Sequence, residues 1–185
     1  MTAIFSADAE TNGLYGDVWA IGAVTLTQAP DQRETEAAVV FSGQLDPDVV
    51  TDPWTWANVV PHVDLPRYDT REHLLDAFWD TWLAHSAASR SVAVADCGYP
   101  VETGLYRACV ELAPEVRWNQ GPFPLHELST WLLAAGLDPE LDRREYVGRT
   151  DLVCHNPVAD ALVQALCWHK VALTLSTAAG WADRG

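Results

Sequence analysis

The sequence predicts an α/β domain with a mixed sheet, and three observations support this prediction. Three short segments of apolar, β-prone residues follow one another near the N-terminus, separated by turn-forming residues. Further along the chain, segments with helical apolar spacing alternate with one more short, strand-like run. The chain has 185 residues, of which 49% are hydrophobic and 20% charged, so residues 1–185 fit a single globular domain without a linker or repeat.

The first three predicted strands lie close together in the sequence. Residues 3–7 have the pattern of a buried strand, and residues 18–26 and 37–44 have that of a second and a third. The Asn-Gly pair at 12–13 has turn chemistry, and the polar residues 28–36 form a plausible hairpin loop. Because short connections join neighbouring antiparallel strands, we expect a three-strand antiparallel N-terminal meander.

The middle of the chain is expected to alternate between loop, helix and strand. Residues 45–69 contain four prolines and are predicted to be irregular. Residues 69–72 offer a helix N-cap. The helix that follows has apolar residues at helical spacing, namely Leu74, Leu75, Phe78, Trp79, Trp82 and Leu83. Residues 91–95 read as a short buried strand, which we expect to pair in parallel with the first strand.

Three more helices are predicted in the C-terminal half. Residues 101–112 form a helix that follows a proline, which the first helical turn accepts. A second helix begins at residues 123–125, continues through 132 and is stopped by Gly136. After a charged loop over residues 137–153, the last helix runs from 155 to about 175. Together these helices would cover both faces of the sheet.

Two acidic residues lie directly after the first predicted strand. Asp8 and Glu10 are spaced i, i+2, so in an extended chain their side chains project on the same face. Adjacent anions at the end of a buried strand repel each other, and the pKa of each rises unless a cation is shared. The pair therefore favours a metal site, although two acids at a strand end also occur as solvated edge residues.

Further acids fall where such a site would need them. Glu102 lies in the first turn of the helix after the strand 91–95, and Asp160 lies in the last helix, soon after His155. Ligands of open α/β sheets collect outside the carboxyl ends of parallel strands. Asp96, which ends the strand itself, competes with Glu102 for the third acidic position. An oxygen-rich set of this kind suits Mg²⁺ or Mn²⁺ better than zinc.

Charge and cysteine content exclude several classes of protein. The formal net charge is −15, with 11 Lys and Arg against 26 Asp and Glu. Proteins that grip long nucleic acids usually have a basic face. The substrate is therefore either not a polyanion or a short end that is held locally, partly through metal ions. The four cysteines form no C-x-x-C pair, which argues against zinc-ribbon and thioredoxin-like sites.

Location and assembly follow from the apolar pattern. No apolar run approaches the roughly 20 residues of a membrane span, and the N-terminus lacks the pattern of a signal peptide. We therefore expect a cytoplasmic protein without a membrane partner. The nine tryptophans are expected mainly in the core, and exposed ones between residues 54 and 82 would suit a homodimer. Tyr99, Trp54 and Trp56 are candidates to stack a base, although packing explains them equally well.

The acidic residues lie within motifs that resemble a known family. Residues 5–14, followed by 19–24, resemble the first motif of the DEDD 3′–5′ exonucleases of the ribonuclease H-like superfamily. That motif reads D-x-E-T-T-G-L with an I-G-A-V strand behind it, and Asn12 departs from it. Residues 155–161 resemble the third motif of the DEDDh branch, H-x-x-x-x-D-A. Residues 125–128 resemble the short helix start that precedes the third motif.

The second motif is irregular. The family pattern reads H-N-x-x-F-D-x-x-F-L after a strand, and residues 101–105 overlay its F-D-x-x-F portion. This overlay makes Glu102 the third acid in place of aspartate, with Asp96 as the competing candidate. The resemblance spans residues 4 to about 170, which is nearly the whole chain.

The resemblance implies a ribonuclease H-like fold and a metal-dependent exonuclease that hydrolyses phosphodiester bonds at the 3′ end of single-stranded or short RNA or DNA. It implies two divalent ions, Mg²⁺ or Mn²⁺, about 3.5–4 Å apart. Asp8 would bridge both ions, and Glu10 and Asp160 would bind one of them. Glu102 would act on the second ion through water. His155 would be the general base that accepts a proton from the attacking water.

The resemblance also implies a substrate-binding turn. The residues of this turn are Thr11, Asn12, Gly13 and Leu14, which would contact the terminal nucleotide. The alternative function is a catalytically weak or inactive nuclease-fold module that binds nucleic acid or a protein partner. Its support is the low basic content together with the departures at Glu102 and Asn12. A third hypothesis, an acidic protein-interaction domain, conflicts with the order of the motifs.

Overall fold

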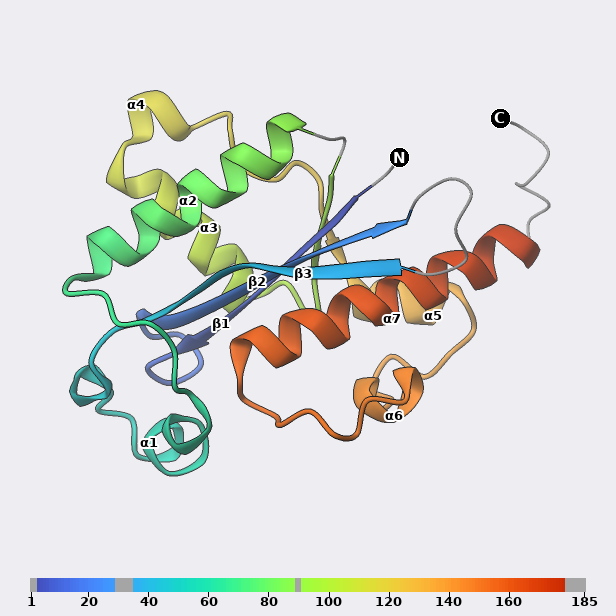
Figure 1. The fold of residues 1–185 in the computed structure, drawn as a ribbon, viewed down its shortest axis with the longest axis horizontal. Helices are drawn as coiled ribbons and strands as arrows, with labels where there is room; N and C mark the ends of the chain where they lie inside the picture. The colour runs from blue at the N-terminus through green and yellow to red at the C-terminus, as the bar shows by residue number, and fades with distance from the viewer. Residues whose placement is uncertain (1–2, 29–34, 89–90, 179–185) are drawn as a thin grey trace.

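A mixed sheet forms the centre of the computed structural model, which describes residues 3–28, 35–88 and 91–178 (Figure 1). Its five strands in these ranges are β1 (Ile4–Thr11), β2 (Val18–Gln28), β3 (Thr35–Gln44), β4 (Val92–Ala95) and β5 (Leu125–Glu127), in the order β3-β2-β1-β4-β5. β2 pairs antiparallel with both β1 and β3. β4 runs parallel to β1, as expected, and β5 runs parallel to β4. The prediction of an α/β domain with a mixed sheet is confirmed.

Helices lie on both faces of this sheet (Figure 1). Those described are η1 (Pro47–Val49), α1 (Pro53–Asn58), η2 (Val60–His62), α2 (Arg71–Ala88), α3 (Val101–Leu112), α4 (Pro114–Arg117), α5 (Leu128–Ala134), α6 (Arg143–Val147) and α7 (Pro157–Ala178). Side chains alternate between the two faces of a strand. Accordingly, Phe5 and Ala7 of β1 pack in the core beneath α2 and α3, whereas Ile4 packs in a second core beneath α5 and α7.

The larger core, beneath α2 and α3, is rich in aromatic side chains. The ring of Phe5 lies edge-on to that of Trp82, with centroids 5.3 Å apart. Trp19 and Trp79 are also buried in this core. Large aromatic residues bury much apolar surface, so these tryptophans serve packing as the sequence indicated. Trp54 and Trp56, in contrast, are exposed.

Several predicted elements are confirmed with small changes at their ends. The helix 101–112 has the predicted bounds, and the strands 18–26 and 37–44 extend by a few residues. At the start of α2, the Thr70 hydroxyl accepts a hydrogen bond from the His73 backbone N–H at 3.2 Å, as the predicted cap requires. Gly136 adopts φ +74° just after α5, which is the left-handed conformation expected after a helix end.

The predicted helix beginning at residues 123–125 is wrong in its first part. Residues 125–127 form β5, and α5 begins only at Leu128. The resemblance of residues 125–128 to a helix start is therefore not matched by the structure. Three residues are too few for apolar periodicity to distinguish a strand from a helix. Pairing with the open edge of β4 decides the outcome, and this pairing is a long-range contact.

Two segments predicted to be loops contain short helices. Residues 45–69 hold η1, α1 and η2, and residues 137–153 hold α6. Both α-helices begin at an aspartate whose carboxylate accepts a backbone hydrogen bond. Asp52 accepts from Thr55 N at 2.8 Å, and Asp142 accepts from Arg144 N at 2.8 Å. Helices this short show no apolar period, so only their caps mark them in the sequence.

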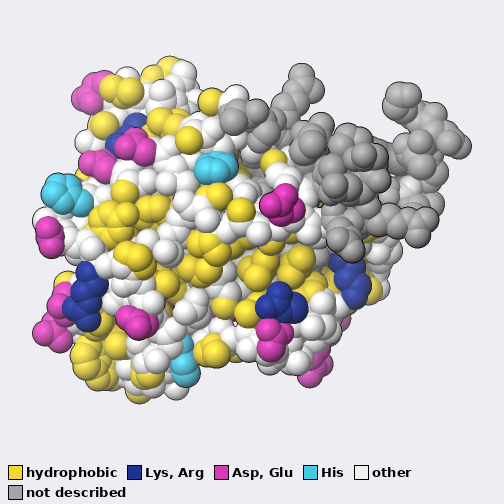
Figure 2. Space-filling model, in the orientation of Figure 1, with side chains coloured by type: hydrophobic (Ala, Val, Ile, Leu, Met, Phe, Trp, Pro, Cys, Tyr) yellow, Lys and Arg dark blue, Asp and Glu magenta, His cyan; other side chains and the backbone are white. Residues whose placement is uncertain are grey.

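Helix α7 is long and apolar enough over Pro157–Ser176 to span a membrane, by length and composition alone. The expectation that no segment approaches such a length is therefore wrong for this helix. In the structure α7 packs along β1 and β2, and 39% of this stretch is buried. Packing against the sheet accounts for the apolar residues on the buried side of the helix. On the face drawn in Figure 2, the basic side chains are few and separated from one another.

Candidate metal centre

Three carboxylates meet near the C-terminal end of β1. One oxygen atom from each of Asp8, Glu10 and Asp160 lies within 4.8 Å of the other two. Asp8 and Glu10 share the face of β1 that α7 covers, because they are two residues apart in a strand. Asp160 comes from the first turn of α7. A strand and a helix that are distant in the sequence therefore build one acidic group.

Gly22 of β2 permits α7 to begin this close to the sheet. It pairs with Asp8 in the register of the sheet. A Cβ atom at Gly22 would lie only 2.3 Å from the backbone carbonyl carbon of Pro157, which is far shorter than any real contact. Only glycine leaves room for the backbone of α7 at this point. Sequence reasoning noted the Ile-Gly-Ala-Val run but did not assign this role to its glycine.

Glu102 is the fourth acid of the group. It is 7% exposed and lies in the first turn of α3. Burial raises the pKa of Asp8 well above its usual value, and Glu102 is the neighbouring charge that raises it most. The charge of Glu102 therefore acts on Asp8.

The pKa values of the remaining carboxyl groups are raised as well. Burial, then the charges of Asp160 and Glu102, raises the pKa of Glu10 to about 8. Burial raises the pKa of Glu102 to about 7 and that of Asp160 to about 6. Four acids in this state cannot all ionise at neutral pH without a compensating cation. Their oxygen atoms are the donors that Mg²⁺ and Mn²⁺ prefer, so the residues fit such ions.

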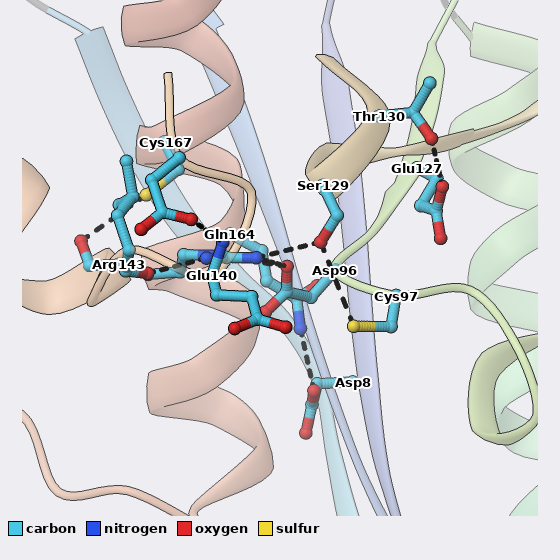
Figure 3. A network of polar contacts seen from close by, with 12 residues as sticks. Asp8, Asp96, Cys97, Glu127, Ser129, Thr130, Glu140, Arg143, Gln164 and Cys167 are labelled. Carbon is cyan, nitrogen blue, oxygen red and sulfur yellow. Dashed lines mark hydrogen bonds and ion pairs between the residues drawn. The ribbon is translucent and has the colours of Figure 1, made fainter. Parts of the chain in front are cut away.

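A buried amide orients Asp8. The Gln164 Nε2 atom donates a hydrogen bond to Asp8 at 2.7 Å (Figure 3). The Gln164 Oε1 atom accepts a hydrogen bond from the Ser6 hydroxyl at 3.1 Å. Both polar side chains are buried, and each satisfies the other. Sequence reasoning missed them, although Gln164 lies one helical turn after Asp160 and Ser6 lies two residues before Asp8, on the same faces.

Asp160 also stabilises the turn that leads into α7. Burial raises the pKa of Asp160, while the backbone N–H of His155, the charge of Arg144 and the backbone N–H of Asn156 lower it. The Asn156 side chain caps the helix by accepting from Ala159 N at 3.2 Å. His155 itself has a φ of +58°, which is unusual for a residue other than glycine. The helix start thus holds His155 in a fixed position beside the acids.

His155 lines a cavity of about 300 Å³ together with Asp8 and Asp160. Its ring lies edge-on to that of Trp54, with centroids 5.6 Å apart. Partial burial, and then the charges of His62 and Arg144, lower its pKa. The ring is therefore neutral at neutral pH and can accept a proton. Chemically, the cavity combines a set of oxygen donors with a base.

Asp96, the competing third acid, has a different environment. The Arg143 guanidinium donates to its carboxylate at 2.8 Å from Nη2 and at 3.1 Å from Nε (Figure 3). Arg143 also donates to the Ser129 hydroxyl at 2.9 Å. Asp96 lines the same cavity as His155, but its charge is compensated by an arginine. The structure thus sets Glu102, rather than Asp96, among the uncompensated acids.

The predicted substrate-binding turn forms hydrogen bonds to the segment around α1. The Asn12 side-chain oxygen accepts from the backbone N–H groups of Thr51 at 2.9 Å and Asp52 at 2.8 Å. The Gly13 N–H donates to the Thr55 hydroxyl at 3.1 Å. The Asn12 side chain is thereby committed to a structural role, which explains an amide at this position. Leu14 is 59% exposed and remains accessible to a ligand.

Comparison of the chain with protein-family models, with curated proteins and with solved structures finds no match. The chemistry of the site is therefore the basis for assigning a function. Within the described ranges, Asp8, Glu10 and Asp160 are the one group of acidic, histidine or cysteine residues spaced to hold a metal ion.

Proposed function

We propose that the protein is a metal-dependent 3′–5′ exonuclease that acts on the 3′ end of single-stranded or short RNA or DNA. The observation that carries the proposal is the convergence of Asp8, Glu10 and Asp160 within 4.8 Å. Glu102 and His155 border the same group. The direction of cleavage rests on the resemblance of the first and third motifs to the DEDDh exonucleases. The sheet, with three successive antiparallel strands and two parallel ones, supports the ribonuclease H-like fold that this resemblance implies.

The acids would divide the work of holding two divalent ions. Asp8, oriented by Gln164, would bridge them, and Glu10 and Asp160 would bind one. Glu102 would act on the other through water. Two such ions, Mg²⁺ or Mn²⁺, supply positive charge that stabilises the attacking and leaving oxygens of a phosphodiester. They would also offset the acidity of the site.

His155 would accept the proton of the attacking water. Its lowered pKa leaves the ring neutral and ready to take a proton at neutral pH. The contact with Trp54 and the helix start at Asn156 hold the ring at the wall of the cavity. A positioned base of this kind needs no large movement before the reaction.

The net charge of −15 limits how the substrate is held. A long polyanion would meet repulsion over most of the surface. A short 3′ end can instead be held at the site itself, where the ions offset the carboxylates. Short or single-stranded ends are therefore the substrates that the charge favours.

The test is digestion of 5′-labelled single-stranded RNA and DNA in Mn²⁺, in Mg²⁺ and in EDTA. A 3′–5′ exonuclease shortens the labelled strand stepwise, whereas the opposite polarity releases the label at once. We expect shortening in either metal, none in EDTA and none with Asp8→Asn. Asp80→Asn, an exposed acid on α2, is the matched control and should digest normally. The proposal fails if the pure protein leaves both substrates intact in both metals.

The alternative is a nuclease-fold module that binds nucleic acid or a protein partner without turnover. Two observations favour it: glutamate stands at position 102 where the family has aspartate, and the Asn12 side chain is engaged by the segment around α1. This alternative predicts that a labelled oligonucleotide is bound in Mn²⁺ but keeps its length. Gel analysis of the bound oligonucleotide distinguishes the two functions.

A further inference from the structure

A second cavity, of about 470 Å³, is lined by residues that neighbour two of the acids in the sequence. One wall is formed by Thr11, the last residue of β1 and the one directly after Glu10, and by the turn that leads to β2. The other wall is the start of α3, which includes Val101 directly before Glu102. The cavity therefore adjoins two of the four acids along the chain, and its size is typical of a small-ligand site.

Two exposed tyrosines from different segments line this cavity. Tyr15 is 75% exposed and Tyr99 is 73% exposed. Their ring centroids lie 6.4 Å apart with the planes inclined at 62°. Neither ring contributes to a core, since most of each surface is open to solvent. Open aromatic rings in a cavity offer a stacking surface to another planar ring.

The cations of the cavity are already paired. Arg71 forms an ion pair with Asp17 at 3.0 Å, and Arg107 forms one with Glu111 at 3.4 Å. All four side chains line the cavity, so its wall carries arginine and carboxylate charges in equal number. The wall therefore presents no net charge that would attract an anionic phosphate. A neutral, planar group suits this wall better.

We propose that the cavity binds one nucleobase of a single-stranded substrate, stacked on the ring of Tyr15 or Tyr99 and in edge contact with the other ring. The inference rests on the proposed function and adds to it a binding site for one base of the substrate. A base that is paired in a duplex cannot leave its partner to enter such a pocket without cost. The cavity thus makes the protein selective for unpaired strands.

The test measures the affinity for a fluorescein-labelled single-stranded oligonucleotide in Ca²⁺, with its length checked afterwards. Tyr15→Ala and Tyr99→Ala should each weaken binding by about tenfold, within the range for loss of one base–aromatic stack. Tyr15→Phe and Tyr99→Phe should bind normally because they keep the ring. Phe123→Ala removes a ring that is 99% exposed outside this cavity, and it is the matched control.

A second arm replaces each base near the 3′ end, in turn, by an abasic position. The unsubstituted protein should lose about tenfold in affinity at the one position that occupies the cavity. With the abasic oligonucleotide at that position, the alanine variants should bind as weakly as they bind the intact oligonucleotide. The ring and the base contribute to affinity only as a pair. The inference is overturned if the alanine variants bind as tightly as the unsubstituted protein, or if the two losses simply add.

Digestion of the same oligonucleotides in Mn²⁺ separates this inference from the proposed function. If binding depends on the tyrosines but no digestion occurs, the exonuclease proposal is wrong and the proposal of a base-binding cavity is retained. If neither digestion nor binding changes in Tyr15→Ala and Tyr99→Ala, only the proposal of a base-binding cavity is wrong. A protein that neither binds nor digests the oligonucleotides would overturn both.

Discussion

Asp8 in β1 and Asp96 at the end of β4 line the same cavity, but the groups next to their carboxylates differ in charge. Asp96 faces the guanidinium of Arg143 at 2.8 Å (Figure 3). Asp8 receives a neutral amide hydrogen bond from Gln164 and is surrounded by other carboxylates. The protein therefore compensates Asp96 with an arginine, whereas the neighbours of Asp8 are a neutral amide and other acids. Acids that lack a protein counter-charge are therefore better candidates for a metal site than an acid paired with arginine.

The largest effect is expected at the centre of the uncompensated group. Asp8→Asn removes the charge that would bridge the ions, and several kcal/mol of transition-state stabilisation go with it. The rate of oligonucleotide shortening should fall by roughly a thousandfold or more. Calorimetric titration should show weaker Mn²⁺ binding as well. If Asp8→Asn binds Mn²⁺ as tightly as the unsubstituted protein, the inference that Asp8 rather than Asp96 is a metal ligand is wrong.

His155 should separate catalysis from metal binding. Loss of a general base costs about 10²–10⁴-fold in rate. We choose His155→Asn because asparagine tolerates the positive φ of +58° found here. The variant should shorten oligonucleotides slowly yet bind Mn²⁺ normally, since the neutral ring does not compensate the acids. Equal losses of rate and of Mn²⁺ affinity would instead identify His155 as a ligand.

The choice between Glu102 and Asp96 can be tested directly. Glu102→Gln should lower activity by about 10–100-fold, the size expected for a group that acts on a metal through water. Asp96→Asn should have a smaller effect, because the carboxylate it removes is paired with Arg143. The measurement is the initial rate in Mn²⁺ for the two variants side by side. If Asp96→Asn is slower than Glu102→Gln, Asp96 rather than Glu102 is the third acid.

The uncompensated acids should make the metal-free protein sensitive to pH. The pKa values of Glu10, Glu102 and Asp160 are raised to about 8, 7 and 6, so the folded chain holds protons that the unfolded chain releases. Their stabilisation is complete below the ordinary carboxyl pKa and is lost as pH rises through about 6 to 8. In EDTA the melting temperature should therefore fall over that range.

The change in melting temperature with pH can be related to a free energy and compared with a control variant. At this chain length, about 1 kcal/mol moves the melting temperature by about 2–4 °C. Glu10→Gln should reduce the fall and Asp80→Asn should not. Mn²⁺ should raise the melting temperature more at the alkaline end of the range, because ligands must be deprotonated to bind. A melting temperature in EDTA that rises with pH would refute the raised pKa values.

The smallest effect is expected at the neutral partner of Asp8. Gln164→Met keeps the volume but removes the hydrogen bonds to Asp8 and Ser6. Partners of this kind tune metal ligands, so Mn²⁺ affinity should fall by about tenfold or less. Ser6→Ala, which leaves the bond to Asp8 intact, should have a smaller effect on affinity. Titration calorimetry of the two variants compares them, and a larger loss for Ser6→Ala would be inconsistent with this chain of contacts.

Much of the fold follows from local pattern. The apolar runs of β1 and β2 and the helical spacing in α2 depend on neighbours within each segment, and these elements appear close to their predicted positions, although β1 continues to Thr11. β5 does not follow from local pattern, because three residues become a strand only by pairing with β4. The helices α1 and α6 depend on caps at Asp52 and Asp142 rather than on a period.

The candidate site divides in the same way. The spacing of Asp8 and Glu10 in the sequence by itself puts both side chains on one face of a strand. Their approach to Asp160 required the start of α7 to lie against Gly22, where no Cβ intervenes. The separation of Glu102 from Asp96 required Arg143 to reach Asp96 from a distant helix. Strand geometry is local, whereas close approach and charge compensation are properties of contacts that only the tertiary structure creates.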